Sequence, residues 1–334
     1  MNQALALAAP ALAQDSPEPP TPASIVAAAP AADWRAIDPA DLLVMTLAPD
    51  RDGNPRQVVI QLMPPPFSQG WVGNVRTLAK AHWWDGTTVY RVVDNWVAQW
   101  GDGEDDTAKA KPLPEGVVSP SQPYESSNAE VTDRQTAQLS TAEFELLTEQ
   151  GMNSDRSKRA RRIQAAINPD GYAERAFLFD GWPIAIGGGR LESPTWPTHC
   201  YASVGVARDL SPDTGTGAEL YAVIGHAPRQ LDRNIAVVGR VIEGIEHLST
   251  LPRGKGDAGV YDKPELRVPI VSVRLGDELP GAERPRFEYL YTWSESFARY
   301  VEVRANRNDA FYKTPAGGID VCNVQVPIRR VAAK

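Results

Sequence analysis

Short apolar runs alternate with turn residues along most of the chain, a pattern typical of β-strands. The runs at 42–48 (LLVMTLA) and 57–63 (QVVIQLM) are separated by PDRDGNP, in which Asp-Gly and Pro favour a hairpin connection. Residues 67–82 then place tryptophan, valine, leucine and alanine side chains at helical spacing. The sequence therefore predicts an antiparallel start that is covered by one helix with an apolar face.

The next strand carries a charge in an unusual place. In TTVYRVVDNWVAQWGDG (87–103), alternation places Arg91 between Val89 and Val93 on one face. Such an arginine is ordinarily a solvated strand residue or an ion-pair partner, so this strand alone does not decide its role. Gln99 is equally open between a contact in a site and a hydrogen bond at a strand end.

The pattern changes between Gly101 and about Trp196. A polar, Pro-rich and acidic stretch at 103–136 precedes a predicted helix that begins near Ser140, where STAEFELL supplies a cap and acidic residues. The later run SKRARRIQAA is a local basic patch, which is typical of the solvated face of a helix. We interpret residues 103–196 as an insertion.

Strand-like runs resume after this insertion. They lie at 201–207, 219–225, 235–242 and 266–275. EGIEHLSTLPRG predicts a short helix that stops at Pro252 and Gly254. Near the C-terminus, Thr292 and Glu295 match a capping box ahead of helically spaced apolar residues, and DVCNVQV predicts a last strand. Many antiparallel strands with two short helices indicate a mainly β fold, a closed antiparallel barrel rather than a doubly wound sheet.

The N-terminal segment has features of a secretion signal. ALALAAPALA is a short apolar run that ends in small residues before Gln14, as at a signal-peptide cleavage site, although no Lys or Arg precedes it. An Ala-rich tail is the alternative. Residues 1–13 are predicted as a signal peptide and residues 14–33, rich in Pro and Ala, as a flexible linker. A signal peptide implies export, so the expected location is periplasmic or secreted.

Composition narrows the classes of partner and cofactor. The chain has 42 acidic and 34 basic residues, a formal net charge of -8, and no long basic block, so its field repels nucleic acid and anionic membrane surfaces. No segment beyond the N-terminal run approaches the roughly 18 unbroken apolar residues of a membrane span. The four histidines and two cysteines show no zinc-site spacing, and no cofactor is expected.

The two cysteines, Cys200 and Cys322, lie far apart in the sequence. In an oxidising compartment a bridge between them would close a long loop, worth about 4 to 5 kcal/mol on a chain-entropy model. Two buried, unpaired thiols are the alternative, and the sequence leaves both open.

Two long segments together resemble a known family. VVIQLMPPPFSQGWVGNVRTLAKAHWWDGTTVYRVVDNWVAQWGD has a strand, a covering helix, an Asp-Gly-Thr turn, an arginine-bearing strand and Gln-x-Gly-Asp in the order found in cyclophilins, the barrel-shaped peptidyl-prolyl isomerases. GTGAELYAVIGHAPRQLDRNIAVVGRVIEGIEHL is similar to the family's Gly-Ser-Gln-Phe-Phe strand, Leu-Asp turn and Phe-Gly-Arg-Val strand. The resemblance covers about a third of the chain. It implies a cyclophilin-like domain over 34–278, with the insertion at 103–196, followed by a C-terminal extension over 279–334.

The resemblance also implies a site. Arg91 matches the family's catalytic arginine, and Gln99 matches the neighbouring glutamine that contacts the substrate backbone. The other positions assigned to the substrate pocket are Trp96, Val97, Ala207, Glu219, Tyr221, Leu231 and Ile235. In the purely structural interpretation, Trp96 and Tyr221 are core aromatics and Leu231 anchors a turn.

Several of these positions depart from the family's pattern. Glu219 replaces a glutamine, and its carboxylate could pair with Arg91 and hold the guanidinium away from a substrate. Tyr221 replaces a phenylalanine and adds a hydroxyl that needs a hydrogen-bond partner. Gln230 and Ile235 stand where many members have tryptophan and histidine or tyrosine. Each substitution weakens the case for strong catalysis.

The implied function is cis-trans isomerisation of X-Pro bonds in an unfolded or flexible polypeptide outside the cytoplasm. The alternative is a catalytically weak or inactive module of the same fold that binds proline-containing segments or a protein partner. A third interpretation makes the insertion the functional part and the barrel its scaffold. Arg91 with Gln99 favours the enzyme, whereas Glu219, Gln230 and Ile235 favour the module.

Overall fold

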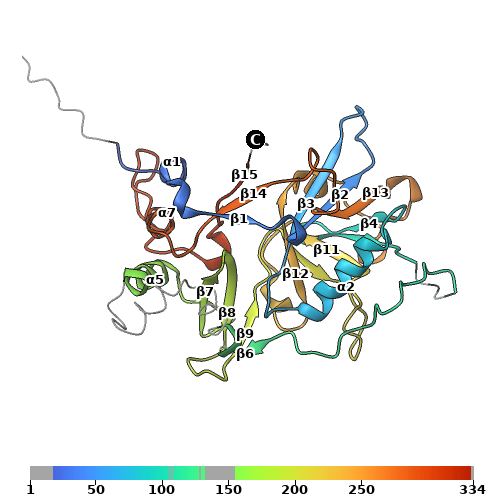
Figure 1. Ribbon diagram of the computed structural model, residues 1–334, viewed down its shortest axis with the longest axis horizontal. Coiled ribbons are helices and arrows are strands. Elements are labelled where there is room, and N and C mark those ends of the chain that lie inside the picture. Colours follow the sequence, from blue (N-terminus) through green and yellow to red (C-terminus); the bar gives the residue numbers. More distant parts are fainter. Residues whose placement is uncertain (1–17, 105, 107, 128, 132–154, 332–334) are drawn as a thin grey trace, which may run out of the picture.

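A closed β-barrel forms the larger part of the molecule. The computed structural model describes residues 18–331 except 105, 107, 128 and 132–154, so the predicted signal peptide lies outside the described residues. Eight antiparallel strands of the described chain close in the order β10-β11-β5-β4-β13-β2-β3-β12 (Figure 1). They are β2 (Leu42–Leu47), β3 (Arg56–Leu62), β4 (Thr88–Val92), β5 (Val97–Gly101), β10 (Ser203–Val206), β11 (Leu220–Val223), β12 (Val237–Glu243) and β13 (Val268–Leu275). The predicted fold class is confirmed.

The two predicted helices cover this barrel. The longer one is α2 (Gln69–Lys80), whose buried face includes Trp71 and Leu78, and the shorter one is α6 (Glu246–Ser249), which buries Leu248. All three side chains belong to the same apolar core as the inward-facing strand residues. The helical spacing of apolar residues was therefore the correct guide to how α2 packs, whereas α6 was predicted from the Pro and Gly that follow it.

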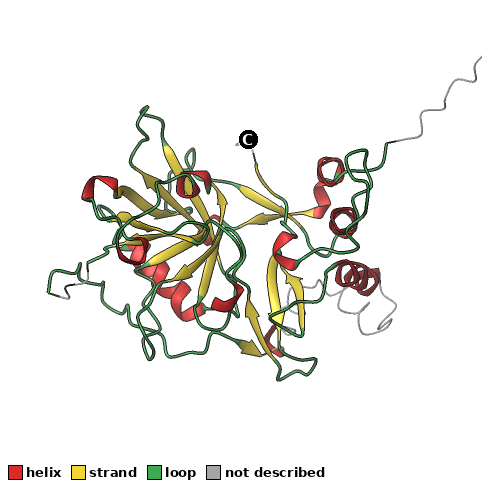
Figure 2. Cartoon of the chain, turned by 180° about the vertical axis from the view of Figure 1, so that it is seen from behind, coloured by secondary structure: helices red, strands yellow, loops and turns green. Residues whose placement is uncertain are grey.

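A second apolar core lies beside the barrel, on the left of Figure 1, and Figure 2 shows the same helices from behind. Three helices build it, α1 (Pro22–Ala28), α5 (Asp155–Ala166) and α7 (Glu295–Ala305). A three-stranded sheet joins it to the barrel: β1 (Trp34–Ile37), β14 (Phe287–Leu290) and β15 (Ile328–Arg330). The N-terminal segment, the insertion and the C-terminal extension thus share one core instead of decorating the barrel separately.

The linker prediction for residues 14–33 is wrong over part of its length. Thr21 caps α1 in a capping box with Ser24, and Ile25 is buried in the second core against α7. A Pro/Ala-rich composition hides this, because proline is well tolerated in the first turn of a helix and the helix is held by packing of Ile25, Val26 and Ala29 on the second core.

The insertion supplies a four-stranded antiparallel sheet of its own. Its strands are β6 (Ser126–Ser127), β7 (Arg175–Phe179), β8 (Trp182–Ile186) and β9 (Pro194–Pro197), in the order β6-β9-β8-β7. Phe179 and Trp182 join the barrel core, whereas Leu178 joins the second core, so β7 connects the two. The basic run forms α5 as predicted, and the helix expected near Ser140 lies outside the described residues.

Two C-terminal predictions are wrong. Helix α7 is capped by Ser294, whose hydroxyl accepts from the backbone N–H of Phe297 at 3.1 Å, and not by Thr292. Residues 321–323 form a 3₁₀ turn instead of a strand, because the Asp320 side chain accepts from the Cys322 N–H at 2.8 Å. The strand follows later, as β15.

The 3₁₀ helices of the described chain are Ala31–Asp33, Pro39–Asp41, Arg229–Leu231, Asp257–Gly259, Pro264–Leu266 and Val321–Asn323.

A disulfide ties the C-terminal extension to the barrel side. Cys200 and Cys322 are bonded with an S–S distance of 2.01 Å across a sequence separation of 122 residues. Of the two alternatives left open by the sequence, the bridge is the one found.

Among the helices of the described chain, none combines the length and apolar character needed to cross a membrane.

Candidate functional site

A β-bulge places Arg91 on the outer side of the barrel. Val89 pairs with Trp100 and Arg91 with Gln99, so Tyr90 is one extra residue in β4. The extra residue interrupts the alternation, and Val89 consequently lies in the barrel core while Arg91 lies outside it. The prediction that these two residues share a face is wrong for this reason, although Val93 does pack in the outer apolar cluster described below.

The guanidinium of Arg91 is held by neutral acceptors. Its Nε donates to the Ala258 carbonyl at 2.6 Å and its Nη1 donates to Gln99 Oε1 at 2.8 Å. Its Cζ lies 5.6 Å from the ring centroid of Trp96, within cation-π range. Nη2 has no hydrogen-bond partner among the residues that the structure describes. Burial lowers the pKa of this half-buried group, but an arginine starts high enough to stay charged.

An apolar cluster lies beside this guanidinium. Its buried members are Val97, Tyr221 and Val223, and partly buried Val93, Trp96, Ala207, Leu231 and Ile235 pack against them. All six apolar residues assigned to the pocket from the sequence therefore converge at one place on the outer face, beside Arg91 and Gln99. Val97 and Tyr221 are only 3% and 4% exposed, so the accessible surface is formed by the partly exposed members, Val93, Trp96, Ala207, Leu231 and Ile235.

Glu219 does not pair with Arg91. Gln99 Nε2 donates to the hydroxyl of Tyr90, which in turn donates to Glu219 Oε2 at 2.9 Å. Glu219 Oε1 accepts the backbone N–H of Asp102 at 2.8 Å. Burial raises the pKa of Glu219 above the usual carboxyl range, against the lowering effect of these hydrogen bonds. Because both ends of the Gln99 amide are used, its oxygen is fixed toward Arg91.

A glycine makes room for this carboxylate. Gly101 follows Trp100 at the end of β5 with φ +151°, and a Cβ added there would lie 2.1 Å from Glu219 Oε2. Backbone N–H groups and the absence of a Cβ at Gly101 thus accommodate Glu219 in place of the family's glutamine. The geometry does not support the hypothesis that Glu219 holds the Arg91 guanidinium away from a substrate.

The added hydroxyl of Tyr221 finds a buried partner, His199. His199 is fully buried, with Nε2 3.0 Å from the Tyr221 hydroxyl and Nδ1 3.0 Å from Asp232 Oδ1. Gly205 is opposite Tyr221 on β10, and a Cβ there would come within 2.3 Å of the hydroxyl. The phenol can therefore lie over β10 only because residue 205 is glycine.

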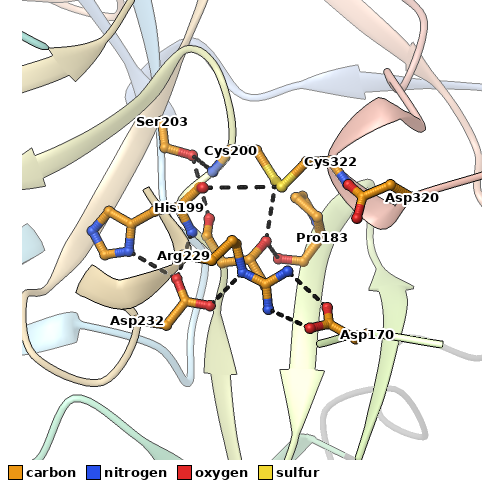
Figure 3. Close-up of a disulfide and its surroundings, with 10 residues drawn as sticks. Asp170, Pro183, His199, Cys200, Ser203, Arg229, Asp232, Asp320 and Cys322 are labelled. Atoms are coloured by element: carbon orange, nitrogen blue, oxygen red, sulfur yellow. Dashed lines mark hydrogen bonds and ion pairs between the residues drawn. A yellow bond between two sulfur atoms is a disulfide. The ribbon is translucent and has the colours of Figure 1, made fainter. Parts of the chain in front are cut away.

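The same network continues to the turn that carries Leu231. Asp232 Oδ2 accepts from Arg229 Nε at 2.6 Å, and Arg229 Nη1 donates to Asp170 Oδ2 at 2.7 Å. Figure 3 shows Arg229 between these two carboxylates, close to the disulfide. The turn is thus anchored at both ends, while Gln230 between them is exposed. Leu231 serves as a turn anchor and as part of the cluster at once.

Several residues of this arrangement were missed from the sequence. Tyr90, His199 and Ala258 contact predicted site residues, and Asp232 contacts His199, yet none of the four stands out by local pattern. The contacts join positions up to 167 residues apart, as for Arg91 and Ala258, so alternation or helical spacing cannot reveal them. The one available signal was chemical: a buried tyrosine hydroxyl requires a partner, and histidines are few in this chain. Within the described residues, no group of three or more His, Cys, Asp or Glu is placed to hold a metal ion.

Comparisons with known proteins support the family and the fold. The family model described as "Cyclophilin type peptidyl-prolyl cis-trans isomerase/CLD" matches residues 58–275. No curated protein matches the chain. Among solved structures, the chain is similar to the cyclophilin AquaCyp293 from Hirschia baltica, with a TM-score of 0.56 and 18% identity over 95% of this chain and 99% of that one. At this identity the structural match supports the fold alone.

Proposed function

The chain belongs to the cyclophilin-type peptidyl-prolyl cis-trans isomerase family, and from that premise we propose that it accelerates cis-trans isomerisation of X-Pro bonds in polypeptides. Rotation about such a bond breaks amide resonance, a barrier of roughly 18 to 20 kcal/mol. Unaided, the step takes tens to hundreds of seconds, which is slow enough to limit folding. The activity would remove that delay without shifting any equilibrium.

Catalysis of this rotation needs no nucleophile and no proton shuttle. As the bond twists, the lone pair of the proline nitrogen localises, so a fixed donor aimed at that nitrogen is more favourable in the transition state than in the ground state. An arginine provides a charged and planar set of donors for this purpose. An apolar surface that grips the pyrrolidine ring supplies the remaining binding energy.

The described residues are suited to these roles. Arg91 supplies the donor, and Gln99 holds the guanidinium through its amide oxygen. Trp96, Leu231 and Ile235 are among the residues that form the accessible apolar surface over the buried ring of Tyr221. One observation carries the proposal: Nη2 of Arg91 lies beside this cluster and forms no hydrogen bond with any described residue. This nitrogen is therefore free to donate to a substrate.

A second candidate is a binding module of the same fold with little turnover. The low exposure of Val97 and Tyr221 favours it, because less apolar surface is open to a proline ring than a deep pocket would offer.

We also propose that the protein acts outside the cytoplasm. The N-terminal apolar run and the Cys200–Cys322 disulfide support this location, since disulfides persist mainly in oxidising compartments.

NMR exchange spectroscopy on a short Ala-Pro peptide tests the proposal. With the protein at a small fraction of the peptide concentration, we expect cis and trans signals to exchange far faster than in peptide alone. Binding without faster exchange would support the module and contradict the enzyme. Mass spectrometry of the exported protein tests the location, with a mature start expected at Gln14 or nearby.

A further inference from the structure

A concave site lies beside the second apolar core, away from Arg91. It is a cavity of about 340 Å³ between α5, β7, β8 and the segment ahead of α7. This volume falls within the range of small-molecule pockets in proteins. Its apolar lining residues are Ala160, Ile163, Phe177, Leu178, Ile186 and Trp293. Such a wall suits an aromatic or branched aliphatic group.

Two arginines line the same cavity without an acidic partner. Arg161 from α5 and Arg175 from β7 are both exposed, and neither forms a hydrogen bond or ion pair within the part of the chain that the structure describes. The acids on α7 do not neutralise them, because Arg162 already binds Glu295 at 2.8 Å and Glu302 at 2.7 Å. In a chain of net charge -8, two unpaired guanidinium groups at one cavity form a local site for an anion.

One acidic residue adjoins this pair of arginines. Glu174 precedes Arg175, and its Oε2 lies 3.7 Å from the position that a Cβ of Gly188 would occupy, while Nη2 of Arg175 lies 3.8 Å from the corresponding position at Gly189. Of these two side chains only Arg175 is among the residues that line the cavity, and the charged residues that line it are both arginines.

The segment ahead of α7 contributes two residues to the cavity wall, and each carries a buried polar atom without a partner. Thr292 is 3% exposed, and neither its Oγ1 nor Nε1 of Trp293 has a hydrogen-bond partner in the described residues. Both atoms are almost fully buried, so they are not exposed to a ligand in the cavity. Trp293 itself is held by the Arg159 Nε, which donates to its carbonyl at 2.7 Å.

We propose that this cavity binds a carboxylate carried on an apolar body. The carboxylate lies between Arg161 and Arg175, and the body packs on Ile163, Phe177 and Trp293. The carboxylate belongs either to a free small acid or to an acidic residue next to an apolar one in a polypeptide. The site is independent of the prolyl isomerase activity, because none of its lining residues belongs to the Arg91 cluster.

Isothermal titration calorimetry on the full chain tests the site with two probe pairs. The first pair is 4-phenylbutyrate and its neutral amide, and the second is acetyl-Phe-Glu-amide and acetyl-Phe-Gln-amide. For ligands of this size we expect a Kd near or below about 1 mM for the acids, with the neutral partners at least about tenfold weaker. The pair that binds more tightly identifies the source of the carboxylate.

Matched variants separate this site from general surface charge. R161Q/R175Q should weaken both acids by at least about tenfold, while R51Q/R299Q, which removes two exposed arginines outside the cavity, should leave the Kd within about twofold. A160L should weaken acids and amides alike, since it fills the apolar part. Melting temperatures identify any variant that has lost its fold. Equal binding of acids and amides, equal effects of the two arginine pairs, or no binding by any probe would overturn the proposal.

Discussion

Arg91 and Gln99 face each other across β4 and β5, with Nη1 of the arginine donating to Oε1 of the glutamine at 2.8 Å. The glutamine is fixed in turn, because its Nε2 donates to Tyr90, which donates to Glu219. A chain of hydrogen bonds therefore runs from Arg91 through Gln99 and Tyr90 to the buried carboxylate of Glu219. This arrangement orients the guanidinium without neutralising it, which is what a donor to a developing lone pair requires.

Removing the amide should impair catalysis more than folding. For Gln99→Ala we expect the catalysed exchange rate to fall about 10- to 100-fold, since a small misplacement of the donor is costly. The measurement is NMR exchange on the Ala-Pro peptide. Gln61→Ala is a matched control, because Gln61 Oε1 holds Arg240 in the same way, at 2.8 Å, outside the site. Equal losses in both variants would contradict the role of Gln99.

Tyr221→Phe should cost stability while its ring keeps the pocket floor. The change leaves Nε2 of the fully buried His199 without a partner, so we expect the free energy of unfolding to fall by about 1 to 3 kcal/mol. Urea unfolding measures this, and the exchange rate should change little. No loss of stability would mean that the Tyr221–His199 hydrogen bond contributes nothing.

Replacing both cysteines by serine should destabilise the chain through its unfolded state. Loss of the Cys200–Cys322 bond frees a 122-residue separation, which corresponds to about 4 to 5 kcal/mol in the chain-entropy model. Urea unfolding with and without a reductant measures it. The reductant should destabilise the wild type and have no effect on the double serine variant. Equal stability of the wild type in both conditions would contradict this prediction.

Glu219 should make stability depend on pH. Burial raises its pKa in the folded state above the unfolded value, so the folded protein retains the proton more strongly. The resulting stabilisation is fully present below the unfolded pKa and is lost as pH rises through the folded pKa. We therefore expect Glu219→Gln to gain stability relative to the wild type as pH increases from 4 to 7, measured by urea unfolding. A relative loss over this range would contradict the assignment.

The barrel was predictable because its strands are short apolar runs bounded by turn residues. The runs that became β2, β3 and β13 each carry enough apolar residues to identify a strand, and the turns between them carry Gly, Asp or Pro. Helix α1 was not predictable from composition, since its burial depends on Ile25 meeting α7 from the far end of the chain.

The sequence predicted which apolar residues belong to the site, but not how the polar residues of the site are hydrogen-bonded to one another. The apolar residues assigned through the family resemblance do meet in one cluster, whereas the bulge at Tyr90 and the partners of Glu219 follow from tertiary contacts. A bulge has no reliable signal in a single strand, because it depends on how the partner strand is held. The prediction of a strand at DVCNVQV was wrong for a similar reason, because the Asp320 turn and the disulfide fix the backbone there.

The most direct test compares wild type, Arg91→Ala and Arg253→Ala in NMR exchange on the Ala-Pro peptide. Arg253 is a matched control, an arginine 37% exposed and ion-paired with Asp94 at 2.9 Å. We predict rapid exchange with the wild type and with Arg253→Ala, and a rate about 100- to 1000-fold lower with Arg91→Ala, as for loss of one donor to a transition state. A wild-type rate no higher than that of Arg91→Ala would contradict the central claim that Arg91 catalyses prolyl isomerisation.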